Sequence, residues 1–262
     1  MALCLGTAQL AQDYGLFKKP KKETVFDILS AAVDGGIEYI DTAPFYGNAE
    51  SLIGTFLQSN GLKLKVITKI PSYKGSDRTE FTNWCKSSAL SSMRSLGRGQ
   101  VWAVLLHDPQ NAKDFPNEMM GLRAWFVATG VVNKFGVSLY EPQDIAHRMM
   151  GIYQFPLNML DTRFIREVPQ HDMIWNGNTI MVRSVYLQGR IEDRQTAMAF
   201  AKRAIAARTK HSLIVIGADK PEFVKESIDL YNKATIDDVK YEQILKESEK
   251  SKVETIDPRK WK

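Results

Sequence analysis

The sequence is poor in the residues that hold small or metal-bound folds together. Its 262 residues include only two cysteines, Cys4 and Cys85, and four histidines scattered along the chain. Two cysteines are too few for a disulfide framework, and no histidine pairs with a cysteine at the spacing of a zinc site. We therefore expect two reduced thiols and no bound metal.

Long apolar runs are also missing. No stretch approaches the roughly 20 apolar residues that span a membrane, and the first residues carry neither a basic region nor an apolar signal segment. The net charge of +5 is spread along the chain, and its local basic run at residues 18–22 is typical of a solvated loop. We expect a cytoplasmic protein that binds neither membranes nor nucleic acid.

A regular alternation of two patterns runs along the whole chain. Short apolar runs rich in β-branched residues alternate with longer amphipathic segments. These patterns predict strands at residues 2–6, 36–41, 65–69, 101–107, 134–137, 152–155, 179–183 and 212–216. They predict helices at 23–34, 49–57, 80–96, 118–129 and 221–231, a helical pattern after each remaining strand, and a helix-prone stretch at 236–250 before a tail.

Eight strand and helix units in succession indicate a parallel sheet with right-handed crossovers, and eight parallel strands close into a barrel. We therefore predict an α/β fold, a single (β/α)8 TIM barrel with a C-terminal helix and tail, as one domain over residues 1–262. A doubly wound open sheet is the competing architecture. The absence of a G-x-G-x-x-G motif after the first strand disfavours it.

Four residues capable of acid and base chemistry fall at or just after predicted strand ends. Asp41 ends the second strand, Lys69 the third and His107 the fourth, while Tyr46 follows Asp41 by five residues. Catalytic groups of such barrels gather at the carboxyl ends of the strands. Each residue alone is more often structural, but together they predict one site at the barrel mouth.

The reduction of a carbonyl would use this combination. Hydride delivery to the carbon leaves negative charge on the oxygen, so an acid must supply a proton while donors stabilise the charge. A phenol titrates at about 10, an adjacent ammonium lowers that pKa, and a carboxylate holds the ammonium in place. We assign Tyr46 as the acid, Lys69 as its activator, Asp41 as the partner of Lys69, and His107 as a donor to the carbonyl oxygen.

The segment from Asp41 to Glu50 has the pattern Asp-Thr-Ala-x-x-Tyr-Gly-x-x-Glu. It resembles the signature of the aldo-keto reductase superfamily, including the spacing between its Asp and its Tyr. Segments at residues 5–8, 105–107, 136–138, 154–161, 183–189 and 216–221 resemble the family's other strands in order. The resemblance covers residues 3–230 and implies an NAD(P)H-dependent oxidoreductase that acts on an aldehyde or ketone.

The resemblance also implies where a nicotinamide cofactor would bind. Ser138 and Gln154 would bond the nicotinamide amide, and Arg183 would stack on its ring. Further cofactor-binding residues, from the first strand ends through the diphosphate loop to the adenosine end, are Thr7, Asp41, Ser184, Gln188, Gly189, Gly217, Lys220, Glu226 and Ser227.

Some positions depart from the family pattern. Leu139 stands where many relatives have Asn, and Gly217 and Phe223 stand where NADPH-preferring relatives have Lys and Arg. Lys220 could supply a positive charge from a neighbouring position. The expectation is therefore NADPH, slightly preferred over NADH.

The resemblance is strongest to bacterial members associated with sugar and polysaccharide metabolism, so a sugar or keto-sugar is the first hypothesis for the carbonyl substrate. The connections after His107 and Gly189 are short, which predicts an open substrate site. Candidate lining residues are Gln9, Tyr14, Phe45, Tyr73, Phe164 and Trp261.

Other interpretations of the site compete with this one. An NAD(P)+-dependent aldose dehydrogenase would use the same residues in reverse, and a non-catalytic sensor subunit that binds nicotinamide nucleotide would need no acid. Tyr14 and Lys18 have the Y-x-x-x-K spacing of short-chain dehydrogenases, but Gly15 and Pro20 interrupt the helix that this pair requires. The sequence leaves the oligomeric state open.

Overall fold

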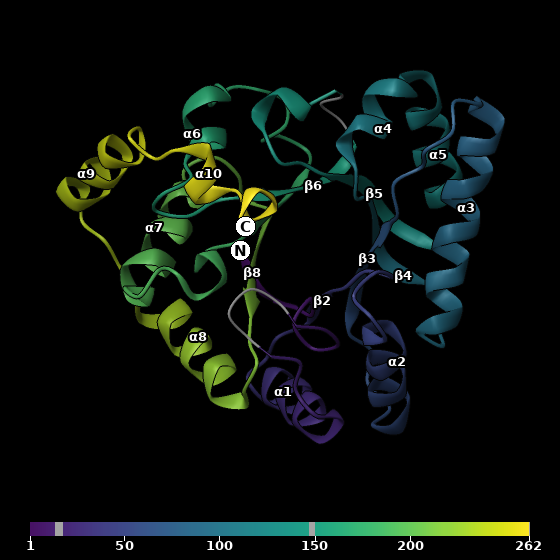
Figure 1. Ribbon diagram of the computed structural model, residues 1–262, viewed down its shortest axis with the longest axis horizontal. Coiled ribbons are helices and arrows are strands. Elements are labelled where there is room, and N and C mark those ends of the chain that lie inside the picture. The colour runs from purple at the N-terminus through teal and green to yellow at the C-terminus, as the bar shows by residue number, and fades with distance from the viewer. Residues whose placement is uncertain (14–17, 147–149, 262) are drawn as a thin grey trace.

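The computed structural model describes residues 1–13, 18–146 and 150–261, and its strands close into one barrel surrounded by helices (Figure 1). Neighbouring strands pair in parallel in the order of the chain, and β1 closes the ring against β8. The strands are β1 (Ala2–Gly6), β2 (Tyr39–Asp41), β3 (Lys65–Ile70), β4 (Val101–Leu106), β5 (Val132–Ser138), β6 (Gly151–Pro156), β7 (Thr179–Arg183) and β8 (Ser212–Gly217). The predicted (β/α)8 barrel is confirmed.

Alternate residues of the strands fill the barrel interior. Side chains point to opposite faces along a strand, so the residues between them face outward into a larger core under the helices. The interior cluster consists of Cys4, Ile67, Ala103, Leu105, Ile152, Met181, Leu213 and Val215.

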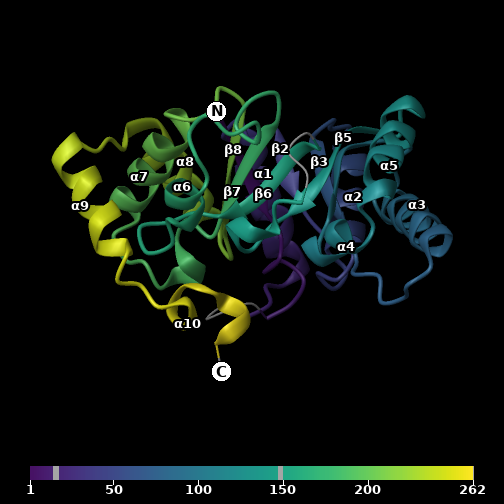
Figure 2. The same ribbon diagram turned by 90° about the horizontal axis from the view of Figure 1, so that it is seen from above.

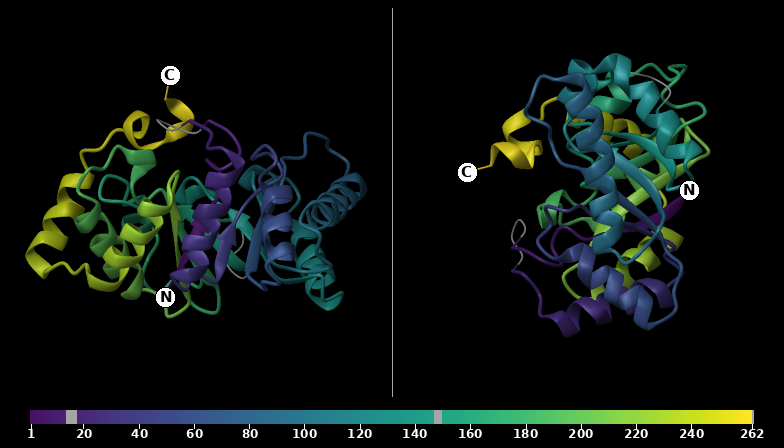
Figure 3. Two further views of the ribbon diagram at one scale, coloured as in Figure 1. Left: turned by 90° about the horizontal axis from the view of Figure 1, so that it is seen from below. Right: turned by 90° about the vertical axis from the view of Figure 1, so that its right-hand side faces the viewer.

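Helices cover the outside of the barrel, as Figures 1 and 3 show. In α2 the residues Ala49, Ile53, Phe56 and Leu57 recur at helical spacing and are buried, which gives the helix one face for the core. The larger helices that follow strands are α1 (Lys22–Asp34), α2 (Ala49–Ser59), α3 (Arg78–Ser95), α5 (Pro116–Ala128), α7 (Arg194–Ala206) and α8 (Pro221–Lys233). No helix of the described ranges is long and apolar enough to cross a membrane.

The second strand is shorter than the sequence predicts. Gly36 has a φ of +80°, its N–H bonds the Val33 carbonyl, and the Ile37 N–H bonds the Ala32 carbonyl. Residues 36 and 37 therefore close the end of α1 instead of pairing with β1. The predicted glycine terminus of this helix is confirmed, but β2 begins only at Tyr39.

The middle of the chain also differs from the prediction. A helix that the pattern did not reveal, α4 (Pro109–Asp114), follows β4 directly, because the Asp108 side chain caps it and Pro109 occupies its first turn. The helical pattern expected after β5 is only a 3-10 turn, η1 (Pro142–Asp144), within the described residues. The helix after β6 is α6 (Arg163–Glu167), with five residues.

The C-terminal segment returns to the barrel mouth. It contains α9 (Asp238–Ser248), α10 (Val253–Ile256) and the 3-10 turn η3 (Pro258–Lys260). Figure 2 shows α10 and the C-terminus at the end of the barrel opposite the N-terminus. Since the N-terminus begins β1, the segment lies at the carboxyl ends of the strands, where the predicted site is.

Candidate active site

The barrel register brings three of the predicted residues to one mouth. Lys69 lies two positions beyond the inward-facing Ile67, and His107 lies two positions beyond the inward-facing Leu105. Asp41 ends β2 opposite Ile67 of the next strand. A period of two residues along each strand therefore points these side chains into the upper end of the barrel.

Lys69 and Asp41 form a buried ion pair. The Lys69 Nζ lies 2.7 Å from Asp41 Oδ1 and donates a second hydrogen bond to the Thr42 carbonyl at 3.0 Å. Lys69 is only 2 % exposed. Burial alone would lower the pKa of this ammonium, but the charges of Asp41 and Tyr46 and hydrogen bonds to both raise it above its ordinary value. Lys69 is therefore a fixed positive charge.

Tyr46 stands beside that charge. The Lys69 Nζ lies 5.1 Å from the centre of the Tyr46 ring, and the interaction with Tyr46 contributes to the raised pKa of Lys69. A turn places the phenol: Gly47 has a φ of +57°, and a Cβ there would lie 2.6 Å from the Ala11 carbonyl oxygen. Only glycine fits this close approach. The predicted contact of Tyr46 with Lys69 is present.

His107 has a partner that the sequence did not suggest. Its Nε2 lies 2.9 Å from the Tyr140 hydroxyl, and its ring stacks obliquely on Phe45 at 4.3 Å. Burial, with the nearby charges of Lys69 and Arg183, lowers the pKa of His107 to about 4. The imidazole is therefore neutral at pH 7 and carries a single ring N–H.

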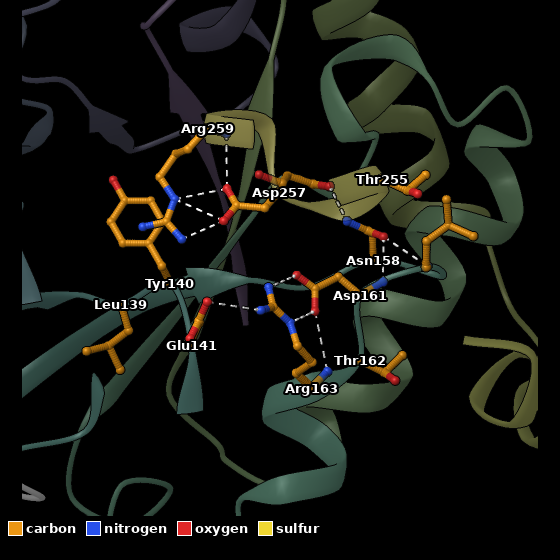
Figure 4. A network of polar contacts seen from close by, with 12 residues as sticks. Leu139, Tyr140, Glu141, Asn158, Asp161, Thr162, Arg163, Thr255, Asp257 and Arg259 are labelled. Atoms are coloured by element: carbon orange, nitrogen blue, oxygen red, sulfur yellow. Dashed lines mark hydrogen bonds and ion pairs between the residues drawn. The ribbon is translucent and has the colours of Figure 1, made fainter. Parts of the chain in front are cut away.

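Two guanidinium groups lie close to the Tyr140 ring. The carbon of the Arg259 guanidinium is 3.8 Å from the centre of the ring, and that of Arg183 is 4.6 Å away. Figure 4 shows Arg259 against the Tyr140 ring, with Asp257 bonded to the same guanidinium. Asp257 also belongs to the tail and is 3 % exposed, so this ion pair orients the Arg259 guanidinium that lies against the Tyr140 ring. The C-terminal segment thus reaches His107 through Tyr140.

A cleft of about 830 Å³, including the space at its opening, begins at Asp41 and Tyr46 and extends to Arg194 and Phe223. Its middle is lined by the loop from Ser184 to Gly189. The described non-glycine residues with positive φ all lie in this loop: Ser184, Leu187 and Gln188. Such strained backbone is concentrated at ligand sites, where successive N–H groups can surround an anion.

The predicted cofactor residues divide into two groups. Those that line the cleft are Thr7, Asp41, Arg183, Ser184, Gln188, Gly189 and Gly217. Those that do not line it are Ser138, Gln154, Lys220, Glu226 and Ser227. Ser138 and Gln154 are buried and bond each other at 3.1 Å between hydroxyl and amide oxygen.

Three functional candidates escaped the sequence reasoning. Arg194 lines the cleft at the start of α7, Tyr140 bonds His107, and Arg259 lies against the Tyr140 ring. Tyr140 follows a predicted strand end, as Tyr46 does, and that position was a usable signal. Arg194 and Arg259 have no comparable signal, because Arg194 lies just after Asp193 and Arg259 lies in the tail after Pro258, and neither position follows a predicted strand end.

Only some of the predicted substrate-site residues lie near the mouth of the barrel. Phe45 lies against His107, Gln9 lines the cleft, and Trp261 packs on Arg190 beside the strained loop. Phe164 does not line an open site: it is fully buried and stacked on the core residue Phe155. Two other predictions have different outcomes: Tyr73 packs among the aromatic residues near α3, and Tyr14 lies outside the described residues.

The fold and the mouth define a barrel enzyme with a buried lysine and carboxylate next to a partly buried phenol at one end of a cleft. The Aldo/keto reductase family model matches residues 2–199. The chain therefore belongs to the aldo/keto reductase family, whose members are NAD(P)-dependent oxidoreductases.

A curated relative and two solved structures are similar to this chain. The D-arabinose 1-dehydrogenase of Saccharomyces cerevisiae is 29% identical over 145 residues, which are 53% of this chain and 42% of that protein. The match thus spans less than half of the relative's length.

Structural similarity covers almost the whole chain. The aldo-keto reductase of Bacillus halodurans in its holo form has a TM-score of 0.74 at 15% identity, covering 99% of this chain and 95% of that one. The aldo/keto reductase of Klebsiella pneumoniae, solved with NADP and acetate, has a TM-score of 0.69 at 17% identity, with coverages of 94% and 91%. At these identities the likeness establishes the shared fold.

Proposed function

We propose that the protein is an NAD(P)H-dependent reductase that converts an aldehyde or ketone to an alcohol, with Tyr46 as the general acid. The observation that carries the proposal is the buried Lys69 ammonium, held by Asp41 at 2.7 Å and in contact with Tyr46. A buried charge is costly to a fold and is seldom retained without a role.

The arrangement suits proton donation by a phenol. Lys69 is surrounded by protein, so its charge acts on Tyr46 through a medium of low dielectric constant and favours the phenolate. A phenol that loses its proton more easily is a better acid for an alkoxide forming at its hydroxyl. Asp41 prevents the ammonium from turning away to solvent.

His107 and Tyr140 would hold the carbonyl oxygen. Neutral His107 has one N–H and Tyr140 one O–H, and they make one bond with each other. Whichever group donates in that bond, the pair retains one further donor. That donor would stabilise the charge developing on the substrate oxygen.

The cleft fits a dinucleotide. It starts at Tyr46 and passes a loop of left-handed backbone suited to a diphosphate. A nicotinamide bound beside Tyr46 would supply the hydride. Arg183, which lines the same end of the cleft, would lie against that ring, and Thr7 and Asp41 form the floor there.

A polyhydroxylated substrate, a sugar or keto-sugar, suits the surface beside His107. A second depression there is lined by Ser72, Asp108, Gln110, Tyr140 and Glu141. Carboxylates, an amide and hydroxyls offer acceptors and donors for hydroxyl groups. The name of the yeast relative, a D-arabinose dehydrogenase, points to the same substrate class and to the oxidative direction as an alternative.

A nucleotide-binding sensor without activity is the weaker candidate, because nucleotide binding alone does not require Lys69 to be buried against a phenol. Titration of NADPH and NADH fluorescence, together with turnover of a panel of aldehydes, ketones and sugars, tests the proposal. We expect the wild type and Tyr46→Phe to bind nucleotide alike, and only the wild type to turn over.

Each part of the proposal can fail separately. Full activity of Tyr46→Phe would refute the role of the phenol, and the absence of nucleotide binding would refute the oxidoreductase itself. Nucleotide binding by the wild type without turnover of any aldehyde, ketone or sugar of the panel would favour the sensor. The cytoplasmic location remains a prediction from the sequence.

A further inference from the structure

The far end of the cleft contains an unusual arrangement of charge. Arg194 of α7 lies there with its guanidinium carbon 4.4 Å from the centre of the Tyr186 ring and 5.0 Å from that of Phe223. All three residues line the cleft, and so does Asp219 from the turn between β8 and α8. This end of the cleft is therefore lined by a cation that lies close to two aromatic rings, and by a carboxylate.

The positive charge of Arg194 is already compensated. Its Nη1 lies 3.2 Å from the carboxylate of Glu226, and its Nη2 donates to the Ser227 hydroxyl at 3.0 Å. Glu226 and Ser227 lie outside the cleft lining, so they engage Arg194 from α8 without reaching the cleft themselves. The third guanidinium nitrogen, Nε, is buried and has no hydrogen-bond partner among the described residues. With two of its three nitrogens engaged by α8, Arg194 offers the cleft a flat surface more than a free charge.

Asp219 is not compensated in the same way. Its Oδ1 is buried and has no hydrogen-bond partner among the residues that the structure describes. Lys220, the neighbouring cation, is exposed and is not part of the cleft lining. Water therefore screens the charge of Lys220, whereas the Asp219 carboxylate is partly shielded from water. Asp219 therefore brings to this end of the cleft a carboxylate oxygen without a hydrogen-bond partner among the described residues.

The chemistry at the Tyr46 end of the cleft indicates which part of the cofactor would occupy the Arg194 end. Hydride transfer requires the nicotinamide to lie beside Tyr46, and the strained loop in the middle suits the diphosphate. The remaining adenosine half would then lie between Tyr186, Phe223 and Arg194. Its ribose hydroxyls would be close to Asp219, which can accept hydrogen bonds from them.

We infer that Asp219 makes this site select NAD(H) over NADP(H), against the slight preference for NADPH that Lys220 suggests. The inference rests on the proposed function. A free 2′-hydroxyl is a donor that satisfies the carboxylate, as an acidic residue does for NAD in other dinucleotide sites. A 2′-phosphate has no proton to donate and adds negative charge beside Asp219, and Arg194 is held by Glu226.

The test compares dissociation constants of NADH and NADPH, measured by fluorescence titration of the full chain. For the wild type we expect NADH to bind at least about tenfold more tightly, or ~1.4 kcal/mol. Asp219→Asn keeps the size of the side chain, and Asp219→Ser removes most of it. Both should reduce the NADH preference about tenfold. Lys220→Ser, the matched control on the exposed neighbour, should leave NADH favoured at least as strongly.

The outcomes are separable. A wild type that prefers NADPH, or an unchanged ratio in both Asp219 variants with native circular dichroism, overturns the inference and leaves the proposed function intact. If the wild type binds neither nucleotide, the proposed function fails first. Glu226→Gln gives an independent check, since releasing Arg194 should strengthen binding of adenosine 2′-monophosphate relative to adenosine. No such gain would contradict the compensation of Arg194.

Discussion

Acidification tests the surroundings of His107 through the stability of the whole protein. In the unfolded chain this imidazole takes up a proton at about pH 6.5, whereas burial and the charges of Lys69 and Arg183 lower its pKa in the folded protein to about 4. Between these values only the unfolded state binds the proton, so the free energy of unfolding decreases as the pH falls. The gap of roughly 2.5 units corresponds to about 3 kcal/mol, an upper bound because the ring is partly exposed.

The measurement is urea unfolding, followed by tryptophan fluorescence, in steps from pH 7 to pH 4. Other groups also titrate in this range, so the comparison is between the wild type and His107→Gln, which keeps a hydrogen-bonding group for Tyr140. We expect the variant to lose up to about 3 kcal/mol less than the wild type over this range. His211→Gln, at an exposed histidine, serves as the control and should follow the wild type. Parallel curves for the wild type and His107→Gln would refute the reasoning.

Two further changes probe the ion pair and the tail. Lys69→Met should lower the free energy of unfolding by about 3–5 kcal/mol, because it leaves the Asp41 carboxylate buried and unpaired. Adding Asp41→Leu should recover more than half of that loss without restoring turnover, and simply additive losses in urea unfolding would contradict this. Arg259→Gln removes the guanidinium above Tyr140 and should raise the KM of the carbonyl substrate about threefold or more, with the nucleotide Kd unchanged. Lys260→Gln is the matched control, and an equal change in both constants would contradict a role at the substrate end.

The strand pattern was a reliable guide to the mouth of the barrel. Asp41, Lys69 and His107 were predicted to meet because each closes an apolar run, and a parallel barrel collects the carboxyl ends of its strands at one face. The register confirms this placement for Lys69 and His107, which continue the inward rows of Ile67 and Leu105. Periodicity is a local property, so the sequence displays it directly.

The lengths of helices and strands were less predictable where the same backbone could either extend a strand or close a helix. Residues 36 and 37 carry an apolar pattern continuous with β2, yet their N–H groups close the end of α1. The pattern records burial, and it does not record which hydrogen bonds the backbone makes. Similarly, α4 depends on the Asp108 side chain as a cap, in six residues that are too few for a periodic signal.

The sequence by itself determined the repeated strands, the family signature from Asp41 to Glu50, and the pairing of Lys69 with Asp41. Only the tertiary structure decided the surroundings of these residues. Tyr140 meets His107 across 33 positions of the chain, and Arg259 reaches Tyr140 from the C-terminal segment. Contacts of this kind depend on where barrel closure and the returning tail place distant side chains, and no local pattern encodes that distance. The same holds for Arg194, because only the tertiary structure pairs its guanidinium with Glu226 and places it in the same cleft as Asp219.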